Sequence, residues 1–202
     1  MIFLWKKNEK KMSIELFIGP MRSGKTSYMV GKFMRFVDSP ISEKGVIISS
    51  ALDNREKKDV ISTHSSSSNN LSSDDGRYRS YLVKSLNEVH LNEDEIFVGV
   101  DECQFIDDII PNCLKWIKEN PKRIIMISGL DSDFNQTPFP NTVNIIPYAR
   151  SVRKFTAICE KCKEMTNPAI FTVLKVGGEE KESNILPGNE WYNTICLECY
   201  EI

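Results

Sequence analysis

The chain contains 202 residues, of which 41% are hydrophobic and 27% are charged, and its formal net charge at pH 7 is -2. This length and composition suit one domain of ordinary size with a small appendage. The slightly acidic balance weakens a function that depends on holding a nucleic-acid backbone electrostatically. No apolar run approaches the roughly 18 residues that span a bilayer, and the apolar residues 1–5 precede the first lysines, which is not the order of a signal peptide. These features predict a cytosolic protein without a membrane or nucleic-acid partner.

Short apolar runs alternate with segments of helical periodicity along most of the chain. The predicted elements, in chain order, are a strand at 14–18, a helix at 25–37, a strand at 46–48, a serine-rich loop at 64–76, a short helix at 81–89, a strand at 96–100, a helix at 109–119, and strands at 124–128 and 143–146. Strands that alternate with helices are typical of the α/β class, in which helices cover both faces of a parallel sheet.

The pattern changes near residue 152, after which cysteines, glycines and short apolar pieces dominate. We therefore expect a tail at 1–12, an α/β domain at 13–152 and a small second domain at 153–202. No repeat of solenoid length is visible.

A phosphate-binding loop follows the first predicted strand and opens the first predicted helix. It consists of Gly19, Pro20, Met21, Arg22, Ser23, Gly24, Lys25 and Thr26. Glycines let the backbone curl so that several N–H groups face one anion, and the helix N-terminus adds its positive dipole end. A lysine at position 25 reaches the β- and γ-phosphates of a nucleotide, and the Thr26 hydroxyl suits Mg²⁺. The loop predicts nucleotide binding, with ATP as the phosphoryl donor.

Two adjacent carboxylates, Asp101 and Glu102, end the predicted strand at 96–100. Ligands of open parallel sheets bind at this edge, and phosphate-loop enzymes place a Mg²⁺ ligand here. We predict that Asp101 is that ligand and that Glu102 is a general base. The alternative is that Glu102 only caps the segment that follows it.

Four cysteines form two Cys-x-x-Cys pairs, Cys159 with Cys162 and Cys196 with Cys199. Each pair presents two thiolates to one tetrahedral zinc ion, so the metal would close the base of a long loop. One such pair alone would also suit a redox motif. Four cysteine ligands leave no open position, so we assign the zinc a structural role. The sequence gives Cys103 and Cys113 no ligand role and predicts partly buried thiols.

Taken together, these motifs resemble the zinc-containing family of thymidine kinases. The resemblance rests on the phosphate loop, on the Asp-Glu-x-Gln-Phe signature at 101–105, and on residues 129–134 with the Pro-Phe pair at 138–139. It implies that Glu102 is the catalytic base, and that Asp53 and Arg55 lie near the phosphates. It also implies a cytoplasmic homotetramer that phosphorylates thymidine, with deoxyuridine as a further substrate.

The resemblance further implies that the loop between the cysteine pairs is a lasso that closes over the nucleoside. The nucleoside-binding residues that it suggests are Phe105, Phe134, Thr172, Ser183, Asn184, Ile185 and Tyr192. The chain departs from the family pattern at Cys103, where glycine is usual, and at Leu174, where arginine is common. The residues themselves leave other interpretations open: Phe105 and Phe134 would also suit a plain core.

Two rival functions belong to other classes. A phosphate-loop ATPase with a zinc ribbon would act on single-stranded DNA, but it needs a basic face studded with aromatic side chains, which this sequence does not indicate. A regulator that only binds nucleotide would not need Lys25, Asp101 and Glu102 together.

Overall fold

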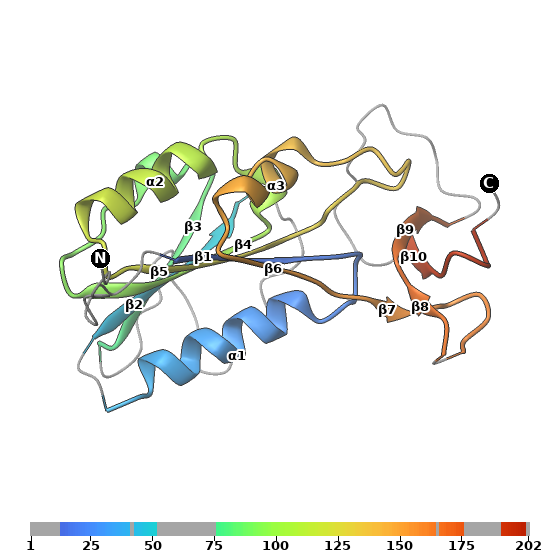
Figure 1. Cartoon of the computed structure of the whole chain (residues 1–202), viewed down its shortest axis with the longest axis horizontal. Coiled ribbons are helices and arrows are strands. Elements are labelled where there is room, and N and C mark those ends of the chain that lie inside the picture. The colour runs from blue at the N-terminus through green and yellow to red at the C-terminus, as the bar shows by residue number, and fades with distance from the viewer. Residues whose placement is uncertain (1–12, 41–42, 52–75, 165, 176–190, 201–202) are drawn as a thin grey trace, which may run out of the picture.

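Six strands form one sheet with the order β3-β2-β4-β5-β1-β6 in the computed structural model of the chain (Figure 1). The strands are β1 (Ser13–Ile18), β2 (Lys44–Ser50), β3 (Tyr78–Val83), β4 (Glu95–Asp101), β5 (Ile124–Gly129) and β6 (Ser151–Lys154). All neighbouring strands of this sheet run parallel. The structure describes residues 13–40, 43–51, 76–164, 166–175 and 191–200. The expected tail at 1–12 lies outside them.

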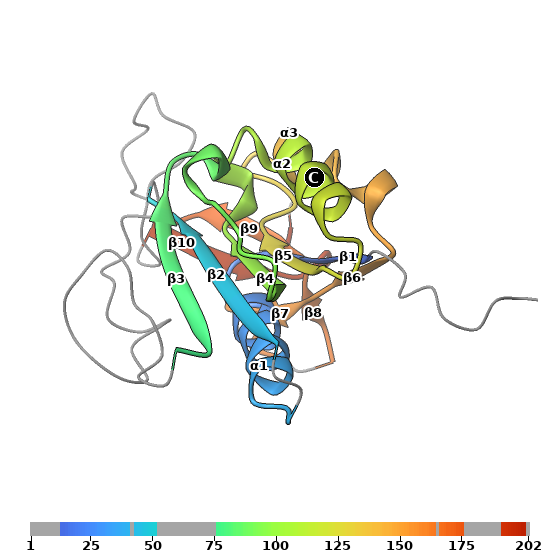
Figure 2. The same ribbon diagram turned by 90° about the vertical axis from the view of Figure 1, so that its left-hand side faces the viewer.

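Helices cover both faces of the sheet, which confirms the predicted α/β class (Figure 2). Helix α1 (Lys25–Val37) lies on one face, while α2 (Ile109–Glu119) and α3 (Pro140–Val143) lie on the other. Alternate side chains of β2 enter different cores: Ile47 is buried with Phe33 of α1, and Ile48 with Trp116 of α2. This alternation follows from the period of two along a strand. Among the described residues, none of the helices has the length and apolar character needed to cross a membrane.

The short helix predicted at 81–89 is wrong. Strand β3 pairs with β2 up to Val83, and a single 3-10 turn, η1 (Leu86–Glu88), follows. Ser85 and Glu88 form a complete capping box around this turn. The strand was missed because only Ser80 and Val83 are buried in it, so its sequence shows no alternation of apolar and polar residues.

The strand predicted at 143–146 is also wrong. This segment contains the end of α3 and the start of the 3-10 turn η3 (Ile146–Tyr148). Pro140 occupies the first turn of α3, where its fixed φ and missing N–H favour a helix start. The remaining strand is β6, which pairs with β1 and crosses the domain boundary expected after residue 152. We propose that this boundary instead follows Phe155.

A small cysteine-containing unit follows the sheet domain. It holds two antiparallel pairs, β7 (Ala157–Ile158) with β8 (Pro168–Ala169) and β9 (Phe171–Leu174) with β10 (Tyr192–Ile195). Figure 1 places this unit beside the end of β1, where the phosphate loop begins. The unit is therefore positioned to touch the nucleotide-binding loop.

Candidate active site

The phosphate loop has the backbone that its sequence predicts. Gly19 and Gly24 have φ values of +148° and +78°, which side-chain-bearing residues rarely adopt. A Cβ atom on Gly19 would lie 2.4 Å from the carbonyl oxygen of Phe155, so glycine is required there for close packing as well. Helix α1 begins at Lys25 and carries no acidic residue in its first turn, so the positive end of its dipole faces the loop uncancelled.

Two polar side chains of the loop are arranged to receive a nucleotide. Lys25 is buried, and its Nζ donates to the carbonyl oxygen of Pro20 at 3.3 Å. The Ser23 hydroxyl is buried and has no hydrogen-bond partner among the described residues. Buried hydroxyls almost always have a hydrogen-bond partner, so the unpaired Ser23 hydroxyl is consistent with a loop that binds phosphate oxygens.

Asp101 lies beside Thr26 at the end of β4. The Thr26 hydroxyl donates to Asp101 Oδ1 at 3.0 Å, and the Ser128 hydroxyl donates to the same oxygen. A hydroxyl next to a carboxylate is a ligand set that suits Mg²⁺, which prefers oxygen donors. Burial, and then the charge of Glu102, raise the pKa of Asp101 to about 6. A divalent cation here would offset that unfavourable environment.

Glu102 leaves the strand in a left-handed conformation, with φ of 53° and ψ of 45°. This conformation interrupts the alternation of side chains along the strand, and Glu102 as a whole is only 4% exposed. The Gln104 amide donates to Glu102 Oε2 at 2.5 Å and accepts from the Leu130 N–H at 3.0 Å. Glu102 makes no side-chain capping bond to the 3-10 turn η2 (Cys103–Phe105) that follows, so the geometry does not support the capping alternative.

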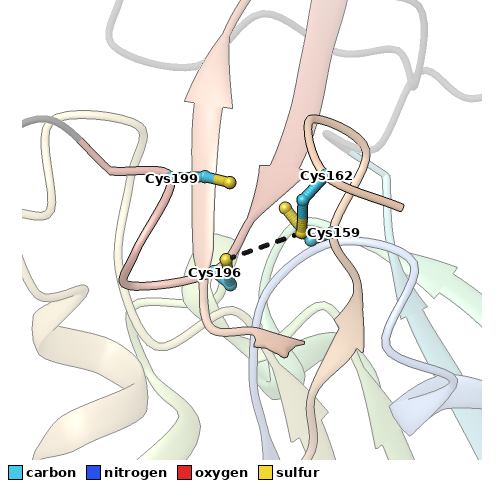
Figure 3. Close-up of side chains that lie close together, drawn as sticks. All are labelled: Cys159, Cys162, Cys196 and Cys199. Atoms are coloured by element: carbon cyan, nitrogen blue, oxygen red, sulfur yellow. Dashed lines mark hydrogen bonds between the residues drawn. The ribbon is translucent and has the colours of Figure 1, made fainter. Parts of the chain in front are cut away.

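The two Cys-x-x-Cys pairs converge, and their four sulfur atoms all lie within 4.8 Å of one another (Figure 3). A tetrahedral zinc with Zn–S bonds of about 2.3 Å holds its sulfurs about 3.8 Å apart, so the cluster fits zinc with little movement. All four cysteines are free. Burial raises the pKa of the Cys159 thiol, but N–H groups of Cys162, Cys196 and Lys161 outweigh it and lower that pKa to about 6. This thiol is therefore prepared to bind as a thiolate.

Cys103 and Cys113 lie outside this cluster. Both thiols are fully buried, and burial raises the pKa of Cys103 to about 12. Cys103 packs against Gly129: a Cβ there would lie 2.4 Å from the Cys103 sulfur. The Cys103 side chain thus occupies the space that Gly129 of the neighbouring strand β5 leaves because it has no side chain.

The proposed nucleoside residues are partly brought together. The rings of Phe134 and Tyr192 lie 6.2 Å apart between centroids, and Phe105 is half-buried three residues from Glu102. Phe105 and Phe134 both remain accessible to solvent, unlike core aromatics such as Phe33. Five further predicted residues lie outside the described part of the chain, namely Asp53, Arg55, Ser183, Asn184 and Ile185.

The phosphate loop and the cysteine-containing unit are in direct contact. The buried N–H of Met21 donates to Thr172 Oγ1 at 3.0 Å. Arg22 forms an ion pair with Glu160, which stands between the first two cysteines, and Glu160 also accepts from the Thr194 N–H at 2.9 Å. The loop that holds the nucleotide is thus connected to both cysteine pairs.

Sequence reasoning missed several residues that organise the site. Ser128 is itself buried within β5, close to its carboxyl end and beside the end of β4, and a polar residue at that position of a parallel sheet indicates a site. Gln104 stands inside a recognised signature, although its two hydrogen bonds depend on the fold. Nothing in the sequence indicates the Arg22–Glu160 pair.

The fold and the site together define a phosphate-loop protein with a four-cysteine cluster that is compatible with zinc. The family model for thymidine kinase matches residues 12–200 of the chain. The chain is 34% identical over 193 residues to the thymidine kinase of Choristoneura fumiferana entomopoxvirus, which covers 94% of this chain and 96% of the relative. It is also 34% identical over 188 residues to that of Vaccinia virus (strain Western Reserve) and over 189 residues to that of Monkeypox virus (strain Zaire-96-I-16), each covering 93% of this chain and 96% of the relative. The chain therefore belongs to the thymidine kinase family.

Proposed function

We propose that the chain transfers the γ-phosphoryl group of ATP directly to the 5′-hydroxyl of thymidine, giving dTMP and ADP. The observation that carries this proposal is the convergence of Lys25, the Thr26–Asp101 pair and Glu102 at the end of the first and fourth strands. This arrangement provides a cation for the phosphates, oxygen ligands for Mg²⁺ and a carboxylate beside them. Membership of the thymidine kinase family supports the choice of nucleoside.

Each group has a separate part in the reaction. The loop amides, Ser23 and Lys25 bind the phosphates and stabilise the charge that develops on the transferred group. Thr26 and Asp101 would hold Mg²⁺, which would supply neutralisation of the phosphate charge. Glu102 takes the proton of the 5′-hydroxyl, and Gln104 holds its carboxylate in place. Asp53 and Arg55 act near the phosphates in this scheme.

The nucleoside lies in a slot formed by aromatic side chains and the lasso. Phe105, Phe134 and Tyr192 contact the thymine, and Thr172 lies at the junction with the phosphate loop. Main-chain groups near Ser183, Asn184 and Ile185 hydrogen-bond to the edge of the base. Uracil presents the same groups at that edge as thymine, so deoxyuridine is a second substrate in this proposal.

Zinc held by the four cysteines would be structural, because four thiolate ligands leave no coordination position open. Free cysteines in two such pairs fit a reducing compartment, which supports a cytoplasmic location. Strand β6 is an exposed edge strand that includes the exposed Val152, and the exposed Ile146 and Tyr148 precede it in the chain. These features support assembly with further copies as a homotetramer.

One assay separates this function from its rivals. ATP turnover is measured with thymidine, with single-stranded DNA, and with neither. We expect turnover only with thymidine, and we expect Glu102→Gln to remove it. Stimulation by DNA instead would favour a DNA-dependent ATPase, and nucleotide binding without turnover would favour a regulator.

A further inference from the structure

We propose that Gln136 is a positioning residue that holds β9, the strand that leads into the lasso, against the loop that carries Phe134. The inference rests on the proposed assignment of Phe134, Thr172 and Tyr192 to the thymidine slot. It adds a residue to which neither the motifs nor the comparisons assign a role.

The loop around Gln136 is built to present this side chain. The Asp133 carboxylate is buried and accepts hydrogen bonds from the N–H groups of Asn135 and Thr137, both at 2.8 Å. Gln136 itself has a φ of 66°, a left-handed conformation that is unusual for a residue with a side chain. Such a conformation persists where its surroundings fix it, and here the Asp133 carboxylate fixes the backbone on both sides.

The Gln136 amide is fully satisfied, and only one orientation fits. Its Nε2 donates to the carbonyl oxygen of Thr172 at 3.0 Å and to that of Phe134 at 3.3 Å. Its Oε1 accepts from the Ser132 hydroxyl at 3.3 Å. A flipped amide would place its oxygen against two carbonyl oxygens, so the donor end must face β9.

This contact sets the distance between two sides of the nucleoside slot. Thr172 is 4% exposed, and its hydroxyl already accepts from the Met21 N–H of the phosphate loop. The neighbouring strand β10 begins with Tyr192, whose ring faces Phe134. The Gln136 bond therefore fixes the Phe134 loop to the same strand pair that carries Thr172 and Tyr192.

The test compares variants that differ in a single group. Gln136→Glu keeps the shape but replaces the donor with an oxygen that repels both carbonyls, whereas Gln136→Met removes the hydrogen bonds without that repulsion. Asn135→Asp is the control, because it makes the same change of charge at an exposed neighbouring position. We expect Gln136→Glu to raise KM for thymidine about 5- to 100-fold, as for a lost partner of a buried carbonyl. Gln136→Met should shift KM in the same direction by less, while KM for ATP and kcat change less than KM for thymidine.

Trypsin cleavage after Lys175, at the end of β9, gives a readout that needs no activity. We expect Gln136→Glu to be cut faster than wild type and Asn135→Asp to be cut at the wild-type rate. If both Gln136 variants match the control in KM and in cleavage, Gln136 does not position β9. If the wild type itself binds no thymidine, the slot assignment fails, and the cleavage comparison still decides the role of Gln136.

Discussion

Replacing Asp101 with asparagine should stabilise the nucleotide-free protein while it removes activity. Asp101 is 6% exposed, and its Oδ1 accepts from both Thr26 and Ser128. The amide oxygen of Asp101→Asn accepts the same two hydroxyls, so the hydrogen bonds survive and the buried charge is lost. The same change removes the carboxylate that we propose as a ligand for Mg²⁺, so we expect the loss of activity.

The size of the stabilisation follows from the pKa of Asp101, which burial raises from 3.8 to about 6. A difference of this size corresponds to roughly 3 kcal/mol, because one pH unit is worth about 1.4 kcal/mol. The folded pKa lies above the unfolded one, so the charged form is unfavourable in the folded state. The wild type therefore bears the full cost above about pH 6 and is relieved of it as the pH falls toward the unfolded pKa. The advantage of the variant should be about half as large at pH 5 and about one-fifth as large at pH 4.

Urea unfolding of both proteins in magnesium-free buffer at several pH values measures this difference. Asp94→Asn is a matched control, because the Asp94 side chain is 49% exposed and its ion pair with Lys44 lies on the surface. Its effect should stay within about 0.5 kcal/mol at every pH. If Asp101→Asn were no more stable than wild type at pH 7.5, or if its advantage did not shrink with falling pH, burial of the Asp101 charge would not be unfavourable.

Three further predictions address the chemistry and the metal. Glu102→Gln should lower kcat about 100- to 10,000-fold while calorimetry still detects thymidine binding; a variant that retains half of kcat would exclude Glu102 as the base. Gly19→Ala should abolish ATP binding, because its Cβ would lie 2.4 Å from the Phe155 carbonyl oxygen; unchanged affinity in a titration would show that the loop moves freely. Elemental analysis should find one zinc per chain, and its chelation should weaken ATP binding before the sheet domain unfolds, because Thr172 and Glu160 contact the phosphate loop. Equal ATP affinity with and without zinc would refute this coupling.

The elements that could be predicted from the sequence are those whose apolar side chains are buried and recur with the period of a helix or a strand. Strand β4 is buried at every position, and α1 and α2 each bury one face, so their patterns were visible. Strand β6 is exposed at every position and is held by backbone pairing with β1, so no side-chain pattern marks it. Strand β3 lies at the opposite edge and buries only two of its side chains, so the sequence at 81–83 does not indicate a strand.

The residues of the candidate site also fall into two groups, those that a local motif predicts and those that meet only in the folded chain. The phosphate loop, the Asp101–Glu102 pair and the cysteine pairs are local motifs, because adjacent residues share one chemical task. The residues that hold these groups in place are distant in sequence: Ser128 supports Asp101, and Leu130 anchors Gln104. Such contacts arise only when the carboxyl ends of neighbouring parallel strands meet at one edge of the sheet.

The metal site and the phosphate loop depend on each other more than the separation into two domains suggests. The Arg22–Glu160 pair is about one-third exposed on both sides, and such pairs contribute at most about 1 kcal/mol. The hydrogen bond from Met21 to Thr172 is buried, and breaking it would leave a main-chain N–H of the loop without a partner, at a cost of about 1–3 kcal/mol. The coupling is therefore carried mainly by Thr172 rather than by the visible ion pair. We therefore expect zinc at the four cysteines to affect catalysis without taking part in the chemistry, because β9 of the cysteine-containing unit carries the Thr172 hydroxyl that accepts from the phosphate loop.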